Sequence, residues 1–181
     1  MAPADQLTVA RALSVPIVIV LYAWSFENHA YWATALFCLA MTTDFFDGKL
    51  ARRHGRSSTL GSLLDPVADK VLVLGTIVML VGLGVVPAWM IATIVVREVL
   101  ITGLRQAAIE RGIVIAARDL GKLKTWAQAI AAAVGGFAAA GAWSHHVAWW
   151  AMLVTVVLTC VSGLDYARVA PSLFKGRGAT V

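Results

Sequence analysis

Charged side chains and cysteines are scarce in this chain of 181 residues. Charged residues make up 14% of it and hydrophobic residues 60%, against about 25% and about 45–50% in soluble globular proteins. Because so little polar surface cannot cover a water-soluble domain, the composition excludes a multidomain soluble enzyme and a disordered chain. Cys38 and Cys160 both lie in apolar runs, which excludes a disulfide framework and a cysteine-based zinc site. The sequence therefore predicts a membrane protein.

Six apolar stretches are long enough to cross a membrane as α-helices. They cover residues 7–26, 30–46, 63–84, 87–111, 123–143 and 147–168. No cleavable signal is expected, because Met1 to Gln6 contain no Lys or Arg. Polar residues near the start, with Arg11, predict an interfacial helix over residues 3–15 that bends into the membrane at Pro16. We expect an all-α integral membrane protein with six transmembrane helices and this short N-terminal helix, forming a single domain over residues 1–181.

The distribution of basic residues predicts the orientation. Lys and Arg gather in three segments, 49–56, 105–124 and 168–177. Three other connections contain neither, namely 26–30, 82–88 and 143–147. The positive-inside rule then places both termini in the cytoplasm, and the net charge of +5 reflects loops facing anionic lipid rather than nucleic-acid binding.

Aromatic residues agree with this orientation. Six of the seven tryptophans fall at the ends opposite the basic segments, as an interfacial belt would: Trp24, Trp32, Trp89, Trp143, Trp149 and Trp150. His29, His145 and His146 fall at the same face, so we interpret them as interfacial residues rather than metal ligands. Residues 129–142 are mostly small, which favours close helix packing inside one bundle over a dimer interface.

Four aspartates stand where a membrane protein tolerates charge poorly. Asp44 and Asp47 come at the end of the second apolar stretch, and Asp65 and Asp69 at the start of the third. Spacings of three and four residues place each pair on one face of a helix. Carboxylates at such a position are candidates for function, and a set of four hard oxygen ligands suits Mg²⁺, Mn²⁺ or Ca²⁺. The spacing predicts a site for two divalent ions.

Small and basic residues accompany the first aspartate pair. Gly48 and Ala51 would open a groove beside the helix backbone, and Arg52 could hold a phosphate by two parallel hydrogen bonds. Metal ligands, small residues and an arginine together indicate a diphosphate site.

These residues form a pattern, Asp44-x2-Asp47-Gly48-x2-Ala51-Arg52-x8-Gly61-x3-Asp65-x3-Asp69. The pattern resembles the signature of the CDP-alcohol phosphotransferase family at each fixed position. Four further segments are similar to the bacterial phosphatidylglycerophosphate synthases within that family: residues 7–16, 64–70, 97–105 and 121–128.

The resemblance implies transfer of a phosphatidyl group from CDP-diacylglycerol to sn-glycerol 3-phosphate, with release of CMP, by a six-helix, usually dimeric domain in the bacterial inner membrane. It also implies that two Mg²⁺ or Mn²⁺ ions are held by Asp44, Asp47, Asp65 and Asp69. By the same resemblance, Asp69 is the general base on the acceptor hydroxyl. The CDP moiety would lie against Gly48, Arg52, Ser57, Ser58 and Gly61.

The acceptor phosphate requires cations of its own. Arg97 lies near the middle of an apolar stretch, where an unpaired guanidinium is strongly disfavoured. Its neighbour Glu98 points about 100° away on a helix, so it cannot neutralise Arg97 fully. We expect Arg97, Arg105 and Lys124 to line a pocket for glycerol phosphate, in preference to forming structural salt bridges.

Two alternatives stay open at this point. Within the same family, the acceptor could be inositol phosphate, serine or phosphatidylglycerol, because the signature reads only the shared CDP-lipid. A divalent-cation transporter is the alternative from another class, since acidic clusters also mark ion pathways. It predicts carboxylates spread through the bilayer and inverted repeats, whereas here they gather at one edge.

Overall fold

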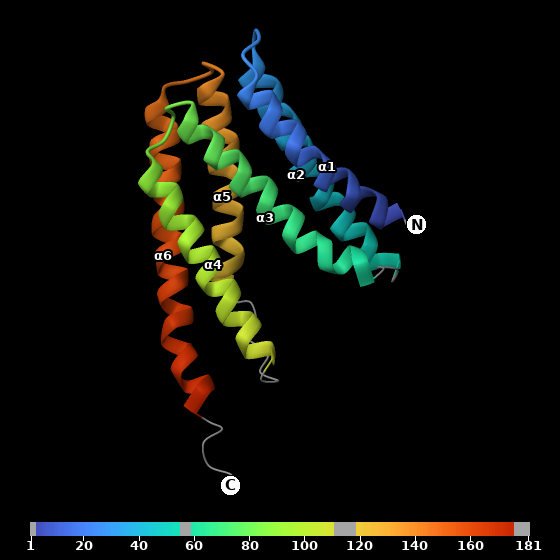
Figure 1. The fold of residues 1–181 in the computed structure, drawn as a ribbon, viewed down its shortest axis with the longest axis vertical. Helices are drawn as coiled ribbons and strands as arrows, with labels where there is room; N and C mark the ends of the chain where they lie inside the picture. The colour runs from blue at the N-terminus through green and yellow to red at the C-terminus, as the bar shows by residue number, and fades with distance from the viewer. Residues whose placement is uncertain (1–2, 55–58, 111–118, 176–181) are drawn as a thin grey trace.

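A computed structural model describes residues 3–54, 59–110 and 119–175 of the chain. The described residues form six α-helices, as the apolar stretches predict (Figure 1). They are α1 (Pro3–Ala23), α2 (His29–His54), α3 (Thr59–Gly82), α4 (Ala88–Glu110), α5 (Asp119–Ala139) and α6 (His145–Lys175). Several helices continue past the apolar stretch that predicted them, because backbone hydrogen bonding does not depend on apolar side chains.

The first helix differs from the prediction. A separate interfacial helix ending at Pro16 is wrong, because α1 runs without interruption from Pro3 to Ala23 and contains Pro16. A proline removes one helical hydrogen bond. Here a single buried face continues across it: Arg11 and Val15 lie before the proline and Val18 after it, all less than 9% exposed, while Pro16 itself is on the exposed side. Packing against neighbouring helices therefore stabilises α1 on both sides of the proline.

The helices form two groups joined through α3 and α5. α1 packs against α2 and α3, and α4 packs against α3 and α6. α5 lies at the centre, where it contacts α2, α3 and α6. Figure 1 shows α1, α2 and the N-terminal half of α3 leaning away from α4, α5 and α6. One described cavity is lined mainly by α2, α3 and α5, and a second by α4, α5 and α6 with Lys70 of α3.

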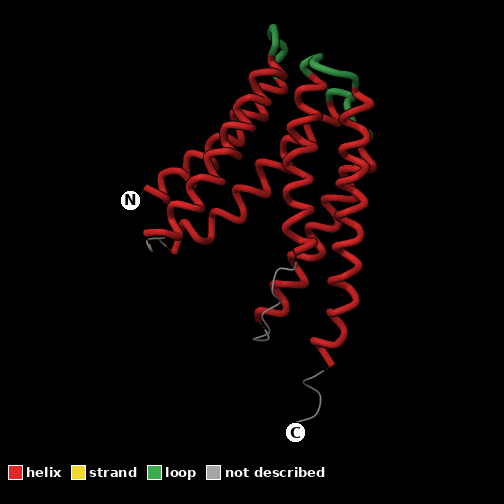
Figure 2. Tube along the Cα trace, turned by 180° about the vertical axis from the view of Figure 1, so that it is seen from behind, coloured by secondary structure: helices red, strands yellow, loops and turns green. Residues whose placement is uncertain are grey.

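The three described connections lie together at one end of the molecule (Figure 2). Gly84 and Gly141 turn the chain there with φ of 69° and 80°, a region that favours glycine, and Asn28 does the same at 59°. Ser144 precedes α6, and its side-chain oxygen accepts a hydrogen bond from the His146 backbone N–H at 3.3 Å. The predicted grouping of these three connections is confirmed.

Small residues of α5 pack inside the bundle, as the sequence predicts. The hydroxyls of Tyr22 and Thr34 share a buried hydrogen bond of 2.8 Å between α1 and α2. Gly136 lies directly against this pair, and a Cβ atom there would collide with both hydroxyl oxygens. Gly135 lies in the same way against Leu80 of α3. Glycine therefore lets α5 approach α2 and α3 closely and contact the Tyr22 side chain of α1.

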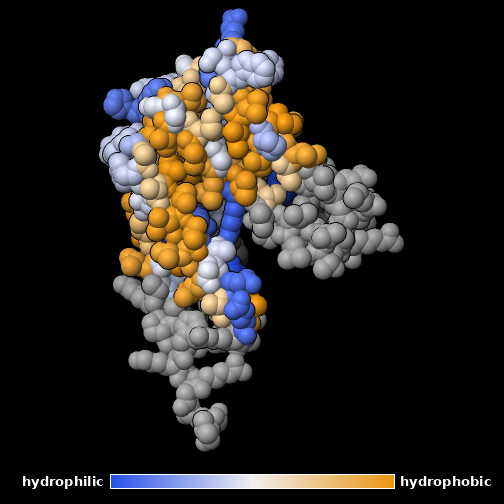
Figure 3. Space-filling model, in the orientation of Figure 1, coloured by the Kyte–Doolittle hydropathy of each residue, from blue (hydrophilic) through white to orange (hydrophobic). Residues whose placement is uncertain are grey.

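The outer surface of the bundle is rich in apolar side chains. Large hydrophobic residues that are at least 40% exposed occur on all six helices, among them Leu13, Leu39, Val78, Val99, Ile130 and Val157. Figure 3 shows hydrophobic side chains over the middle of the visible face, with hydrophilic ones at the loop end and the end of α4. By length and composition, one helical segment of the described chain, His145–Tyr166, is long and apolar enough to cross a membrane. Ala10–Ala23 and Lys70–Gly82 are shorter apolar helical segments.

Candidate functional site

The four aspartates of the sequence pattern occupy two consecutive helices. Asp44 and Asp47 belong to α2, and Asp65 and Asp69 belong to α3. Gly48 and Arg52 follow on α2, and Gly61 begins the pattern's second half on α3. The side chains of these residues, and Ser57 and Ser58 altogether, lie outside the described residues. Their arrangement around two metal ions therefore stays a prediction, and no other cluster of metal ligands occurs among the described side chains.

The three cations expected to bind the acceptor line one pocket. Arg97 and Arg105 reach it from α4, and Lys124 from α5. The pocket has a volume of about 380 Å³, and Lys70 of α3 adds a fourth cation to its lining. Among the described residues of this lining, Glu98 is the one carboxylate. These described residues, four cations and one carboxylate, carry a formal excess of three positive charges, which suits a dianionic ligand.

Arg97 contacts residues from two helices. Its side chain is 11% exposed, and its Nη1 donates to Glu98 Oε1 at 3.2 Å. Its Nη2 donates to Ser162 Oγ of α6 at 2.7 Å. These two bonds use two of the five N–H donors of a guanidinium. Arg97 is therefore held in place and still has donors to offer to a phosphate.

Glu98 is the counter-ion of this pocket. Its carboxylate forms an ion pair with Lys124 Nζ, and both side chains are less than 10% exposed. Gln128 Nε2 of α5 lies 3.5 Å from the same oxygen. The sequence analysis treated Glu98 as an incomplete partner for Arg97 alone, whereas the structure gives it two cationic partners. An ammonium has three N–H donors, so Lys124 can hold Glu98 and contact a phosphate at once.

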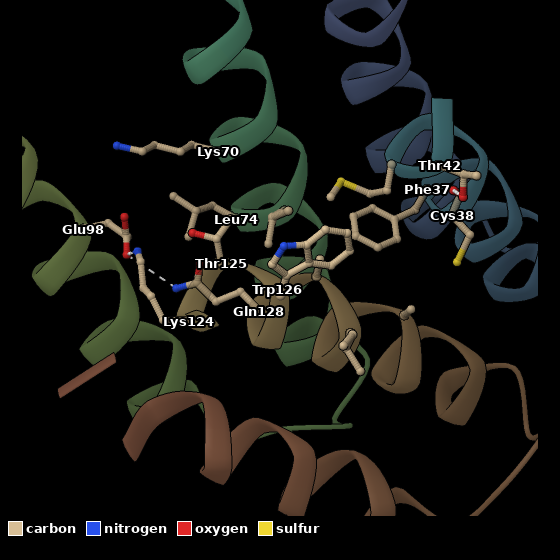
Figure 4. Close-up of a pocket in the computed structure, with 15 residues that line it drawn as sticks. Phe37, Cys38, Thr42, Lys70, Leu74, Glu98, Lys124, Thr125, Trp126 and Gln128 are labelled. Atoms are coloured by element: carbon tan, nitrogen blue, oxygen red, sulfur yellow. Dashed lines mark hydrogen bonds and ion pairs between the residues drawn. The ribbon is translucent and has the colours of Figure 1, made fainter. Parts of the chain in front are cut away.

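A larger apolar cavity adjoins the cationic pocket. It has a volume of about 600 Å³ and lies among α2, α3 and α5, with Phe37, Met41, Leu74 and Ile130 in its lining (Figure 4). Five residues line both spaces: Lys70, Glu98, Lys124, Thr125 and Trp126. We call these five residues the shared wall. A polar pocket beside an apolar cavity suits a reaction between a small phosphorylated molecule and a lipid.

Comparison with known sequences identifies the family. The sequence model described as CDP-alcohol phosphatidyltransferase matches residues 1–161. The chain belongs to this family. The phosphatidyltransferase match includes the complete aspartate pattern, α2 to α5 and residues 145–161 of α6, and it ends before Tyr166, the α6 residue in the cationic pocket.

Curated relatives of this phosphatidyltransferase carry related names. A probable phosphatidylglycerophosphate synthase of Mycobacterium tuberculosis strain H37Rv is 36% identical over 170 residues, which cover 92% of this chain and 80% of the relative. A CDP-diacylglycerol–glycerol-3-phosphate 3-phosphatidyltransferase of Bacillus subtilis strain 168 is 40% identical over 139 residues, which cover 70% and 72%. One from Shigella flexneri serotype 5b is 35% identical over 170 residues, which cover 91% and 92%.

The pocket of this phosphatidyltransferase contains residues that the sequence did not single out as acceptor-binding. Lys70 follows Asp69 directly and donates to Thr102 Oγ1 of α4 at 2.9 Å. The rule that singled out Arg97, a charge inside an apolar stretch, applies equally to Lys70. Ser162 and Tyr166 of α6 also reach Arg97. Their spacing of four residues predicts that they share one face of an apolar helix. The sequence does not predict which other helix that face contacts.

Proposed function

We propose that this chain transfers the phosphatidyl group of CDP-diacylglycerol to sn-glycerol 3-phosphate, giving phosphatidylglycerophosphate and CMP. The observation that carries the proposal is the pocket of four cations beside α3, the helix of Asp65 and Asp69. A phosphomonoester dianion matches its excess of positive charge, and family membership supplies the CDP-linked donor. The names of the curated relatives support the same acceptor.

The donor side of the reaction rests on the aspartate pattern. Four carboxylates on consecutive helices are the hard oxygen set that Mg²⁺ or Mn²⁺ prefers, so Asp44, Asp47, Asp65 and Asp69 are the residues to hold two such ions. When bound, the ions would offset the negative charge of the diphosphate. On the same pattern, Gly48, Arg52, Ser57, Ser58 and Gly61 hold the CDP moiety.

The chemical step needs a base and a positioned acceptor. The acceptor hydroxyl oxygen forms a new bond to the phosphatidyl phosphorus, the diphosphate P–O bond breaks, and CMP leaves with that bond's electrons. We assign removal of the hydroxyl proton to Asp69. Lys70, next to it on α3, lines the cationic pocket, so an acceptor bound there by its phosphate would lie near the base.

The membrane arrangement is part of this proposal. We infer that all six helices cross the bacterial inner membrane, with both termini and the active site in the cytoplasm and the whole chain acting as one domain. Exposed large hydrophobic residues on each of the six helices support a lipid-facing surface. By family resemblance we infer a homodimer.

The pocket also ranks the alternative acceptors. Serine is a zwitterion without a phosphate, and phosphatidylglycerol is a singly charged diester, so neither uses four cations well. Inositol phosphate carries the same phosphomonoester as glycerol 3-phosphate and is the alternative that the charge of the pocket permits. Membership of an enzyme family, with this pocket, argues against the cation transporter.

The test is an acceptor panel. Purified protein in detergent–lipid micelles is incubated with CDP-diacylglycerol, Mg²⁺ and one acceptor at a time: glycerol 3-phosphate, inositol phosphate, serine or phosphatidylglycerol. CMP release and the lipid product are measured, with the Asp69→Asn variant as control. We expect release only with glycerol 3-phosphate. Release with inositol phosphate instead would transfer the assignment to the sister activity, and no release with any acceptor would refute it.

A further inference from the structure

α6 carries a line of buried polar residues on an apolar helix. Thr155, Thr159, Ser162 and Tyr166 are each at most 5% exposed, and their spacing of three and four residues places them on one face. They lie within or at the end of His145–Tyr166, the candidate membrane span. Because polar groups in such a helix are costly unless they have partners, this face calls for an explanation.

The two ends of this polar face contact different helices. Thr155 Oγ1 has two backbone acceptors within hydrogen-bond distance, the oxygen of Ala151 in α6 at 2.9 Å and that of Ala127 on α5 at 3.1 Å. Ser162 Oγ instead accepts a hydrogen bond of 2.7 Å from the Arg97 guanidinium on α4. α4 and α6 pack side by side, so this bond spans a helix interface (Figures 1 and 2).

Two further α6 residues shape the space around Arg97. The Tyr166 ring centroid lies 5.8 Å from Arg97 Cζ, within the range of a cation–π interaction, and Tyr166 lines the cationic pocket. Gly163 leaves room for the side chain: a Cβ atom there would lie 3.2 Å from Arg97 Cγ and 3.5 Å from Nε. A hydrogen bond, a ring face and a missing side chain thus converge on one arginine.

We propose that Ser162, Gly163 and Tyr166 form an arginine clamp, a set of positioning residues that holds Arg97 ready for the phosphate of the acceptor. The inference rests on the proposed function and assigns α6 a part in acceptor selection. An arginine free to change rotamers loses conformational entropy when it binds a ligand. The clamp removes that loss in advance, so its effect falls on acceptor binding and not on the CDP-lipid.

Two clamp variants and a matched control test this. Ser162→Ala removes the hydrogen bond, and Tyr166→Leu removes the ring. We expect each to raise the KM for glycerol 3-phosphate about five- to tenfold, the effect of having to immobilise one rotamer-rich side chain on binding, with kcat and the KM for CDP-diacylglycerol within twofold of wild type. Thr155→Val removes a buried hydroxyl from the same helix face without touching Arg97, so its KM values should match the wild type.

Tyr166→Phe separates the ring from the hydroxyl and guards against misfolding. It keeps the ring face, so we expect a KM for glycerol 3-phosphate within twofold of wild type and an unchanged thermal midpoint in detergent. If Tyr166→Phe raised this KM as much as Tyr166→Leu, the ring would not be the contact and that part of the clamp would be wrong.

A double-variant cycle shows whether Ser162 acts through Arg97. In an Arg97→Gln background, Ser162→Ala should have no further effect on the KM for glycerol 3-phosphate, because its partner is already gone. Additive effects would overturn the clamp. If Arg97→Gln raises this KM and the clamp variants do not, the clamp alone fails. If Arg97→Gln itself leaves it unchanged, the assignment of the acceptor pocket fails.

Discussion

Lys124→Gln, compared with a double variant, tests whether Lys124 contacts the acceptor phosphate in addition to its buried ion pair with Glu98. The substitution removes one member of a pair in which both side chains are less than 10% exposed. Breaking a buried pair costs about 3–5 kcal/mol, because the remaining charge stays buried. Here the Glu98 carboxylate keeps Arg97 at 3.2 Å and Gln128 at 3.5 Å. We therefore expect the low end, about 3 kcal/mol, or a fall of about 6–12 °C in the thermal midpoint.

The double variant Glu98→Gln/Lys124→Gln gives the contrast. It removes both charges, so most of the lost stability should return. It also leaves the net charge of the pocket lining unchanged, since one cation and one carboxylate leave together. If Lys124 contacts the acceptor phosphate directly, the KM for glycerol 3-phosphate should stay at least about tenfold raised in both variants, the effect of one charge-assisted contact.

The assay combines thermal unfolding in detergent with steady-state CMP release at varied concentrations of each substrate. Glu27→Gln, an exposed carboxylate at the loop end, serves as the control for the amide substitution. Recovery of both stability and the KM for glycerol 3-phosphate in the double variant would refute direct contact and leave Lys124 with a structural role. Full stability of the single variant would refute the ion pair itself.

Three further predictions concern the metal, the packing and the topology. Activity should vanish in excess EDTA and return with Mg²⁺ or Mn²⁺, and full activity in EDTA would contradict the metal assignment. Asp65→Asn should abolish activity while the protein still inserts into the membrane. Gly136→Ala should lower stability by about 1–3 kcal/mol through overpacking, whereas Gly103→Ala, which meets no atom within 4 Å, should not; equal midpoints would refute the close approach of α5. In a variant without the native cysteines, a cysteine placed in 49–61 should be labelled only from the cytoplasm and one in 84–87 only from outside, and the reverse pattern would refute the orientation.

The sequence predicted the features that depend on short-range periodicity. Apolar length predicted the six helices, and the three connections without Lys or Arg lie together at one end. The same reasoning failed at Pro16, because the missing backbone donor was weighed without the buried face of Arg11, Val15 and Val18 that continues across it. The sequence around Pro16 shows that one helical hydrogen bond is lost there. Only the tertiary structure shows that packing of the buried face offsets this loss.

The candidate site shows the same division. A charge inside an apolar stretch was enough to single out Arg97, which lines one pocket with Arg105 and Lys124. Its partners could not be predicted, since Ser162 is 65 positions away. The sequence of neither helix predicts that α4 packs against α6. Glu98 was assigned to its neighbour in sequence, while its ion pair with Lys124 joins α4 to α5, two helices that both pack against α3 and α6.

From the shared wall we expect ligand binding in the two cavities to be thermodynamically linked. Lys70, Glu98, Lys124, Thr125 and Trp126 face both spaces, so a molecule that shifts them from one side changes the lining on the other. Linkage of this kind is reciprocal. If a ligand in the apolar cavity changes the affinity of the cationic pocket for its ligand by some factor, the ligand in the cationic pocket changes the affinity of the apolar cavity by the same factor. We therefore expect that an inhibitor bound in the apolar cavity can weaken the binding of glycerol 3-phosphate without resembling it.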